Sequence, residues 1–105
     1  MILSTTESIT GWKIIEIKGL VRGSSIRSKH LGKDIGAALK SLVGGELKGY
    51  SELLEESREE ALQRMIEDAE RQGANAVIAL RFSSSQIMNG AAEILAYGTA
   101  VRIEK

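Results

Sequence analysis

Cysteine is absent from this chain of 105 residues, and histidine occurs once, at His30. Without cysteine the chain can form neither a disulfide nor a thiolate metal site, and it has no cysteine nucleophile. Zinc, copper and nickel prefer several imidazole or thiolate ligands. The residue types of a single chain therefore give no support to a transition-metal site.

Aromatic residues make up 4% of the chain, so the core must be built from Ile, Leu, Val, Ala and Met. Lys+Arg and Asp+Glu both number 14, and a net charge of zero gives no argument for a nucleic-acid partner. No apolar run approaches the ~20 residues of a membrane span, and no signal peptide is recognisable. We expect one domain over residues 1–105, in the cytoplasm and without a membrane partner.

Hydrophobic patterning predicts an α+β protein with elements in the order β-β-α-α-β-β. The predicted elements are strands at 2–6, 13–21, 75–83 and 92–103 and helices at 35–43 and 51–72. Ser51 is expected to cap the long helix, and Gly73 to end it. Asn89-Gly90, within the connection between the last two strands, predicts a hairpin turn.

The last two strands carry apolar residues on both faces. In 92–103 one face holds the larger side chains, and the other is rich in alanine and glycine. We predict two layers, an antiparallel sheet with helices on one face, and expect the alanine- and glycine-rich face to stay uncovered. Burying this face against copies of the chain is the simplest way to shield it. The alternative is that the uncovered face is small and only weakly apolar.

A basic connector is predicted at 22–33, where Arg22, Arg27 and His30 alternate with serine and glycine. Such groups hold phosphates, nucleotides or a nucleic-acid backbone. The connector lacks a phosphate-loop pattern and an aromatic stacking platform. It is therefore better read as a solvated loop, or as a partner for the acidic helix of a neighbouring subunit. Copies of His30 could meet at a metal only near a symmetry axis.

The predicted long helix begins with glutamates, Glu52 first, that could supply oxygen ligands to a hard cation. They lie opposite the apolar stripe, as on any solvated helix face. The serine run at 83–85 lacks a GxSxG motif and a nearby histidine, so no catalytic residue is nominated. An enzyme would need groups from two subunits to meet in one pocket.

Several segments together resemble the YbjQ-like family, small prokaryotic proteins labelled "putative heavy-metal-binding". The segments are ILSTT, GLVRGSSIRS, GGELKGYSELLEESREEAL, GANAVIALRFSSS and AAEILAYGTAVRI, in order along the whole chain. The resemblance implies a β-α-β-β core similar to the dodecin-like architecture, with added strands that join subunits into a ring, typically a pentamer. It brings no established activity. The glycines around Tyr50 are expected to form a pocket, or simply a turn between helices.

The leading hypothesis is a non-enzymatic, ring-forming homo-oligomer, a pentamer by resemblance, with a ligand or metal site at subunit interfaces. The candidate ligand-binding residues are Arg22, Arg27, His30, Tyr50 and Glu52. The three basic residues would hold a small anionic group, Tyr50 would wall a pocket, and Glu52 would bind a cation or an arginine across the interface. The alternatives are a polyanion-binding module using 22–33 and, least favoured, an enzyme with an interface active site. No cofactor is indicated.

Overall fold

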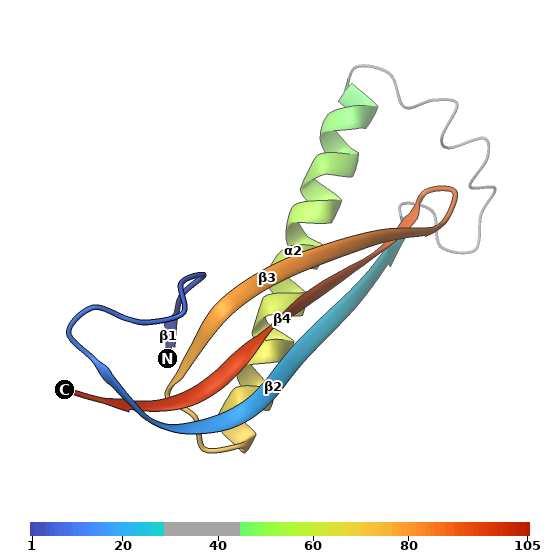
Figure 1. The fold of residues 1–105 in the computed structure, drawn as a ribbon. Helices are drawn as coiled ribbons and strands as arrows, with labels where there is room; N and C mark the ends of the chain where they lie inside the picture. The colour runs from blue at the N-terminus through green and yellow to red at the C-terminus, as the bar shows by residue number, and fades with distance from the viewer. Residues whose placement is uncertain (29–44) are drawn as a thin grey trace.

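The computed structural model of the chain describes residues 1–28 and 45–105, with the backbone alone for 45–50 (Figure 1). Its elements are β1 (Ile2–Leu3), β2 (Lys13–Ser28), α2 (Gly45–Arg71), β3 (Ala76–Met88) and β4 (Ala91–Glu104). The strands form one sheet in the order β1-β3-β4-β2, with α2 packed on it. The α+β class is therefore confirmed. The predicted helix at 35–43 lies outside the described residues.

The sheet is mixed, which corrects the prediction of an antiparallel one. β2, β4 and β3 are antiparallel neighbours, but β1 runs parallel to β3. The Ser4 N–H donates to the Val77 carbonyl at 2.9 Å, and the Leu80 N–H donates to the Ser4 carbonyl at 3.0 Å. These bonds hold the start of the chain against β3. Alternation along a sequence identifies a strand but says nothing of its partner's direction, so the pattern could not reveal this.

β2 is longer than predicted, because it continues through Arg22 and ends at Ser28. The first part of the predicted basic connector is thus an edge strand, paired with β4 from Lys13 to Ser28. Val21, Gly23 and Ser25 are buried, while the residues between them are exposed. Serine and glycine are rare in strands, and here the ladder to β4 overrides their propensity.

The hairpin between β3 and β4 confirms the turn predicted at Asn89-Gly90. Gly90 has φ 78°, a conformation that favours glycine. The two strands reach closer to this turn than the sequence indicated, so the serine run at 83–85 lies within β3 instead of ending it.

α2 is one continuous helix from Gly45 to Arg71, so the predicted turn around Tyr50 and the cap at Ser51 are wrong. Glycine at 49 lowers helix propensity without breaking the helix. The predicted end is confirmed. The Ala74 N–H donates to the Ala69 carbonyl, and Gly73, at φ 81°, donates to the Glu70 carbonyl, which is a Schellman cap. No helix in the described part of the chain is long and apolar enough to cross a membrane.

The helix packs on the small-residue face of the sheet, which reverses the predicted assignment. Ala61, Met65 and Ala69 are fully buried and contact a cluster that includes Ala96 and Ala100 of β4. A Cβ atom built on Gly23 would lie less than 3.0 Å from backbone atoms of Ala61 and Met65. The helix backbone can approach this closely only over small residues, so the face expected to stay open is the covered one.

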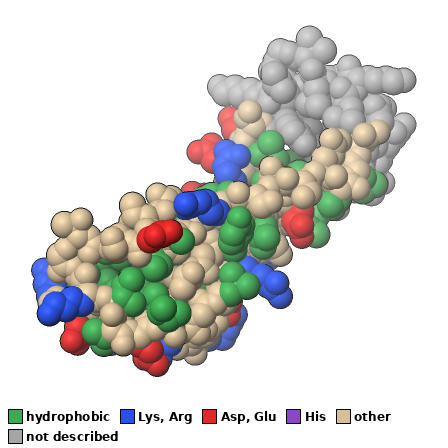
Figure 2. Space-filling view, viewed as in Figure 1, with side chains coloured by type: hydrophobic (Ala, Val, Ile, Leu, Met, Phe, Trp, Pro, Cys, Tyr) green, Lys and Arg blue, Asp and Glu red, His purple; other side chains and the backbone are tan. Residues whose placement is uncertain are grey.

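The described residues cover the opposite face of the sheet at one end. There Ile78, Val101 and Ile103 pack with Ile9 and Trp12 of the N-terminal segment. The remainder, called the open face below, has no covering element among the described residues. It comprises Leu20, Arg22, Ser24 and Ile26 of β2, Glu93, Leu95, Tyr97 and Thr99 of β4, and Arg81, Ser83 and Ser85 of β3. In the space-filling view, hydrophobic side chains gather over the strands with charged ones among them (Figure 2).

Candidate functional site

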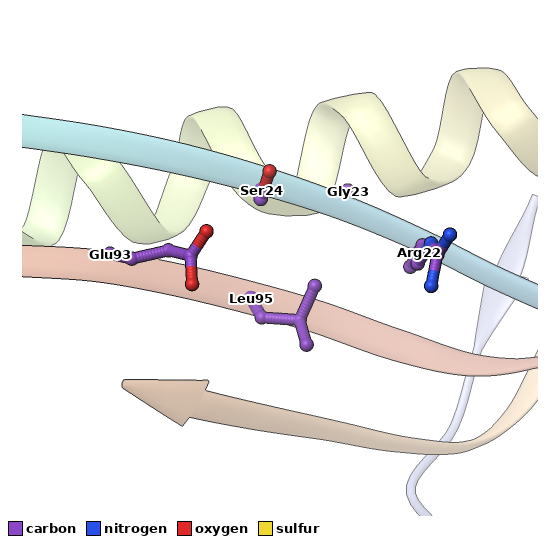
Figure 3. A pocket seen from close by; sticks show the side chains of 5 residues that line it. All are labelled: Arg22, Gly23, Ser24, Glu93 and Leu95. Atoms are coloured by element: carbon purple, nitrogen blue, oxygen red, sulfur yellow. The ribbon is translucent and has the colours of Figure 1, made fainter. Parts of the chain in front are cut away.

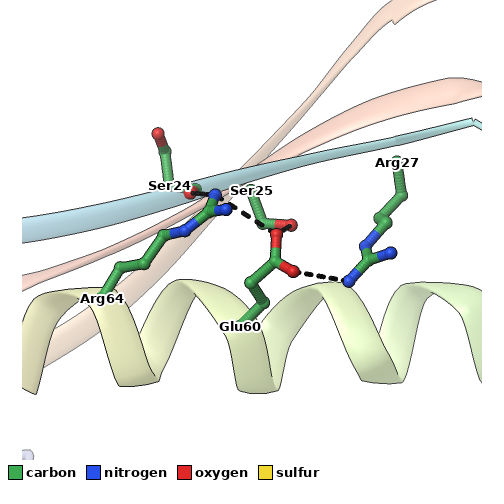
Figure 4. A network of polar contacts seen from close by, with 5 residues as sticks. All are labelled: Ser24, Ser25, Arg27, Glu60 and Arg64. Carbon is green, nitrogen blue, oxygen red and sulfur yellow. Dashed lines mark hydrogen bonds and ion pairs between the residues drawn. The ribbon is translucent and has the colours of Figure 1, made fainter.

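Two polar constellations lie on opposite faces of β2. The first is centred on Glu60 of α2, which joins the helix to the strand (Figure 4). Ser25 Oγ donates to Glu60 Oε1 at 2.7 Å, and Arg27 Nη2 donates to Glu60 Oε2 at 2.6 Å. Arg64 Nη1 lies 3.2 Å from Glu60 Oε1 and donates to the Ser24 carbonyl at 2.6 Å.

This network keeps Glu60 ionised. The hydrogen bond from Ser25 lowers the pKa of Glu60 below its ordinary value of 4.5, and the charges of Arg27 and Arg64 lower it further, against a smaller opposing effect of desolvation. The carboxylate therefore remains charged at neutral pH and holds Arg27 against the helix. Because Glu60 holds the Arg27 guanidinium, Arg27 is less available to bind an anion from outside the chain.

The second constellation is a shallow hollow on the open face, lined by Arg22, Gly23, Ser24, Glu93 and Leu95 (Figure 3). The two charged side chains lie at its ends, and Leu95 lies between them. The Arg22 side chain is on the open face, while its backbone N–H donates to Asp68 Oδ2 of α2 at 3.3 Å. The hollow thus offers a cation, a hydroxyl, an apolar contact and an anion.

Within one chain, the two arginines of the predicted site lie on opposite sides of β2. Arg22 pairs in register with Tyr97 on the open face, whereas Arg27 reaches Glu60 on the helix side. Glu52 is exposed on α2, beside a row of further glutamates. Tyr50 belongs to α2, and its side chain is not described. His30 lies outside the described residues. Convergence of Arg22 and Arg27 on one ligand would require a second chain.

The metal suggested by the family label can be tested against the donor set. Among the side chains that the structure describes, those of 1–28 and 51–105, no group of three or more His, Cys, Asp or Glu could hold a metal ion. The glutamate row from Glu52 to Glu59 is exposed, and carboxylates suit hard cations better than soft heavy metals. The described residues of one chain do not fit a heavy-metal site.

Sequence reasoning missed Glu60, Ser25 and Glu93 as members of these constellations. Glu60 and Arg64 were recognisable as an i,i+4 helix pair, but the partners on β2 depend on the tertiary fold. Glu93 is the one charged residue on the face of β4 that carries the larger side chains, such as Leu95 and Tyr97. That interruption of an apolar alternation was a signal that could have been used.

Comparison with known proteins gives consistent results. A family model described as "Putative heavy-metal-binding" matches residues 1–104. A UPF0145 protein of Clostridioides difficile is 64% identical over 104 residues, which cover 99% of this chain and 93% of that protein. A UPF0145 protein of Thermotoga petrophila is 62% identical over 105 residues, 100% of this chain and 99% of that protein.

A solved structure has a similar fold. It is the crystal structure of a protein of unknown function, assigned to the DUF74 family, from Pediococcus pentosaceus. The TM-score is 0.61 at 18% sequence identity, and the match covers 99% of this chain and 98% of that one. At this identity the likeness concerns the fold alone.

Proposed function

The chain belongs to the YbjQ-like (UPF0145) family, and from this premise we propose that it is a non-enzymatic protein that assembles with copies of itself by burying its open face. The names of its relatives carry no enzymatic activity. The observation that carries the proposal is the apolar content of the open face. A self-assembled scaffold, with ligand sites at its interfaces, is the function that this surface supports best.

The open face exposes large apolar side chains to solvent in a single chain. Leu20 and Ile26 are 65% and 60% exposed, and Leu95 and Tyr97 are only half-buried. Burying an aliphatic side chain of this size stabilises an assembly by about 1.5–3 kcal/mol. Contiguous apolar patches on a sheet face are characteristic of contact surfaces.

The edge of the sheet adds to this surface. Among the described strands β2 pairs with β4 alone, so its other edge has no strand partner there. Side chains of α2 bond the Arg22 N–H and the Ser24 carbonyl of β2. Near its start Ile15 and Ile17 are 52% and 69% exposed. Long apolar edges template pairing with another chain. A head-to-tail contact that uses one edge closes into a ring when its rotation permits, and five copies is the number that the family resemblance implies.

The ligand site belongs to the same proposal. Arg22 and Glu52 are exposed, so each can reach a group supplied by a neighbouring copy. Together with Arg27, His30 and Tyr50 they remain our candidates for binding a metal ion or a small anion at the interface. The polyanion alternative has less support, because Arg27 is engaged by Glu60 and lies on the opposite side of β2 from Arg22.

Size measurement on matched variants tests the proposal. Ile26→Glu places a charge on the open face, and Gln63→Glu places the same charge on an exposed position of α2. Light scattering after size exclusion should give an oligomer for the parent and for Gln63→Glu, but a smaller species for Ile26→Glu. Circular dichroism should show all three folded. A parent that is monomeric at tens of micromolar would refute the proposal.

A further inference from the structure

The open face carries three charged residues, Arg22 of β2, Glu93 of β4 and Arg81 of β3. Arg81 donates to the Thr5 and Leu80 carbonyls, each at 2.8 Å, so its guanidinium has partners. In the part of the chain that the structure describes, neither Arg22 nor Glu93 forms an ion pair with another residue. This contrasts with Arg27, Arg64 and Arg71, all of which have carboxylate partners. Among the described residues of the open face, Arg22 and Glu93 are therefore the charged side chains with neither an ion pair nor a hydrogen-bond partner.

The two charges are too far apart to pair within a chain. Arg22 lies opposite Tyr97, and Glu93 lies opposite Ile26, so the two charges are offset by four positions along the strands. At about 3.3 Å per residue the separation is about 13 Å. Leu95 and Ser24 lie between the two side chains (Figure 3).

Burial of the open face makes partners for both charges necessary. A charge removed from water without a partner is strongly unfavourable, and it would oppose the gain from burying the surrounding apolar side chains. A surface with a cation at one end and an anion at the other can meet a second copy with opposite charges in contact. In a ring, each copy can set its Arg22 against Glu93 of the next copy, so that both charges of every copy gain a partner.

We infer that Arg22 of one copy forms an ion pair with Glu93 of a neighbouring copy across the open face, and that this pair sets the alignment of the contact. The inference rests on the proposed self-assembly and specifies its interface. Leu95 lies between the two groups, and once a second copy excludes water from the open face an ion pair there is less screened than on an open surface. The hollow of Figure 3 is then one half of a contact completed by the second copy.

A charge-reversal cycle tests the pair. Arg22→Glu and Glu93→Arg should each weaken assembly about tenfold or more, measured as the dissociation constant by analytical ultracentrifugation. The double variant Arg22→Glu/Glu93→Arg should recover affinity to within about threefold of the parent, because the pair is restored with its signs exchanged. Arg58→Glu and Glu67→Arg, exposed on α2, are matched controls and should assemble like the parent.

The outcomes separate this inference from the proposal beneath it. A parent that assembles while the single reversals leave its affinity unchanged would overturn the ion pair and leave self-assembly standing. Single reversals that weaken assembly without rescue in the double variant would also overturn it. A monomeric parent would refute the proposed function, and the inference with it. Thermal unfolding of each variant shows whether a lost assembly reflects lost folding.

Discussion

Gly23→Ala adds a single methyl group where the helix and the sheet are closest. The new Cβ would lie less than 3.0 Å from the Ala61 carbonyl oxygen, the Met65 amide nitrogen and the Arg64 carbonyl carbon. All three are backbone atoms of α2, so relief requires moving the helix and not merely a side chain. Overpacking of this kind costs about 1–3 kcal/mol or more, and we expect a loss of about 3 kcal/mol.

The assay for this prediction is urea and thermal unfolding at a fixed protomer concentration, because assembly makes stability depend on concentration. A loss of about 3 kcal/mol lowers Tm by about 10–20 °C in a domain of this size. Two controls isolate the cause. Ser24→Ala, exposed on the same strand, should change stability by less than about 0.5 kcal/mol.

Gly11→Ala is the second control. It has no atom within 4 Å of the new Cβ, and only its φ of 86° opposes the change, so it should cost about 1 kcal/mol. If Gly23→Ala lowered the unfolding free energy no more than Gly11→Ala does, α2 would not pass directly over β2. The account of why the helix selects the small-residue face would then be wrong.

Three further predictions concern the helix and its network. Ser51 lies inside α2, where alanine favours the helix more than serine does, so Ser51→Ala should raise the unfolding free energy by up to about 0.5 kcal/mol. A decrease of about 1 kcal/mol in the same urea titration would instead indicate that Ser51 caps the helix. Gly73→Ala should lower the unfolding free energy by about 1–2 kcal/mol because alanine is strained at the φ of 81° found there. Crowding adds little, since the new Cβ would meet only Lys18 atoms at 3.8 Å. An unchanged Tm would argue against the Schellman cap. The Glu60 pKa is lowered by folding, so its stabilisation is complete above pH 4.5 and is lost as the pH falls through the folded pKa. Glu60→Gln should remove that part of the acid dependence, and a parent and variant with superimposable stability-against-pH curves would contradict the network.

The sequence predicted those features that a local pattern records. Apolar alternation located β4, the Asn89-Gly90 pair located the hairpin turn, and Gly73 marked the end of the helix. Local pattern failed where tertiary contacts decide the structure. The polar run from Arg22 forms a strand because its backbone pairs with β4. Gly49 lies within α2 although glycine lowers helix propensity.

The choice of the covered face was also beyond the local pattern. Size suggested that the larger side chains of β4 would pack under the helix, but the close approach at Gly23 requires small residues beneath the helix backbone. The distance at which a helix packs on a sheet depends on the side chains of both elements, and the pattern of one strand gives only the side chains of that strand. The error has a consequence for assembly, because the face that remains open is the one with Leu95 and Tyr97.

The candidate site was predictable in its residue types but not in its grouping. Arg22 and Arg27 look equivalent in a basic run, yet strand alternation sends them to opposite faces, and only the assignment of 22–28 to a strand reveals it. The partners Ser25 and Glu60 are 35 residues apart in the sequence, so no spacing rule could join them. The single histidine offered no pattern at all.

The central claim is that copies of this chain bury the open face, and native mass spectrometry of the untagged protein, prepared without chelators, tests it most directly. The account predicts a single assembly of several copies, five for the ring that the family resemblance implies, and any metal or small molecule held at the interfaces would add to its mass. A spectrum of monomer alone, at concentrations where the protein remains folded, would contradict the account.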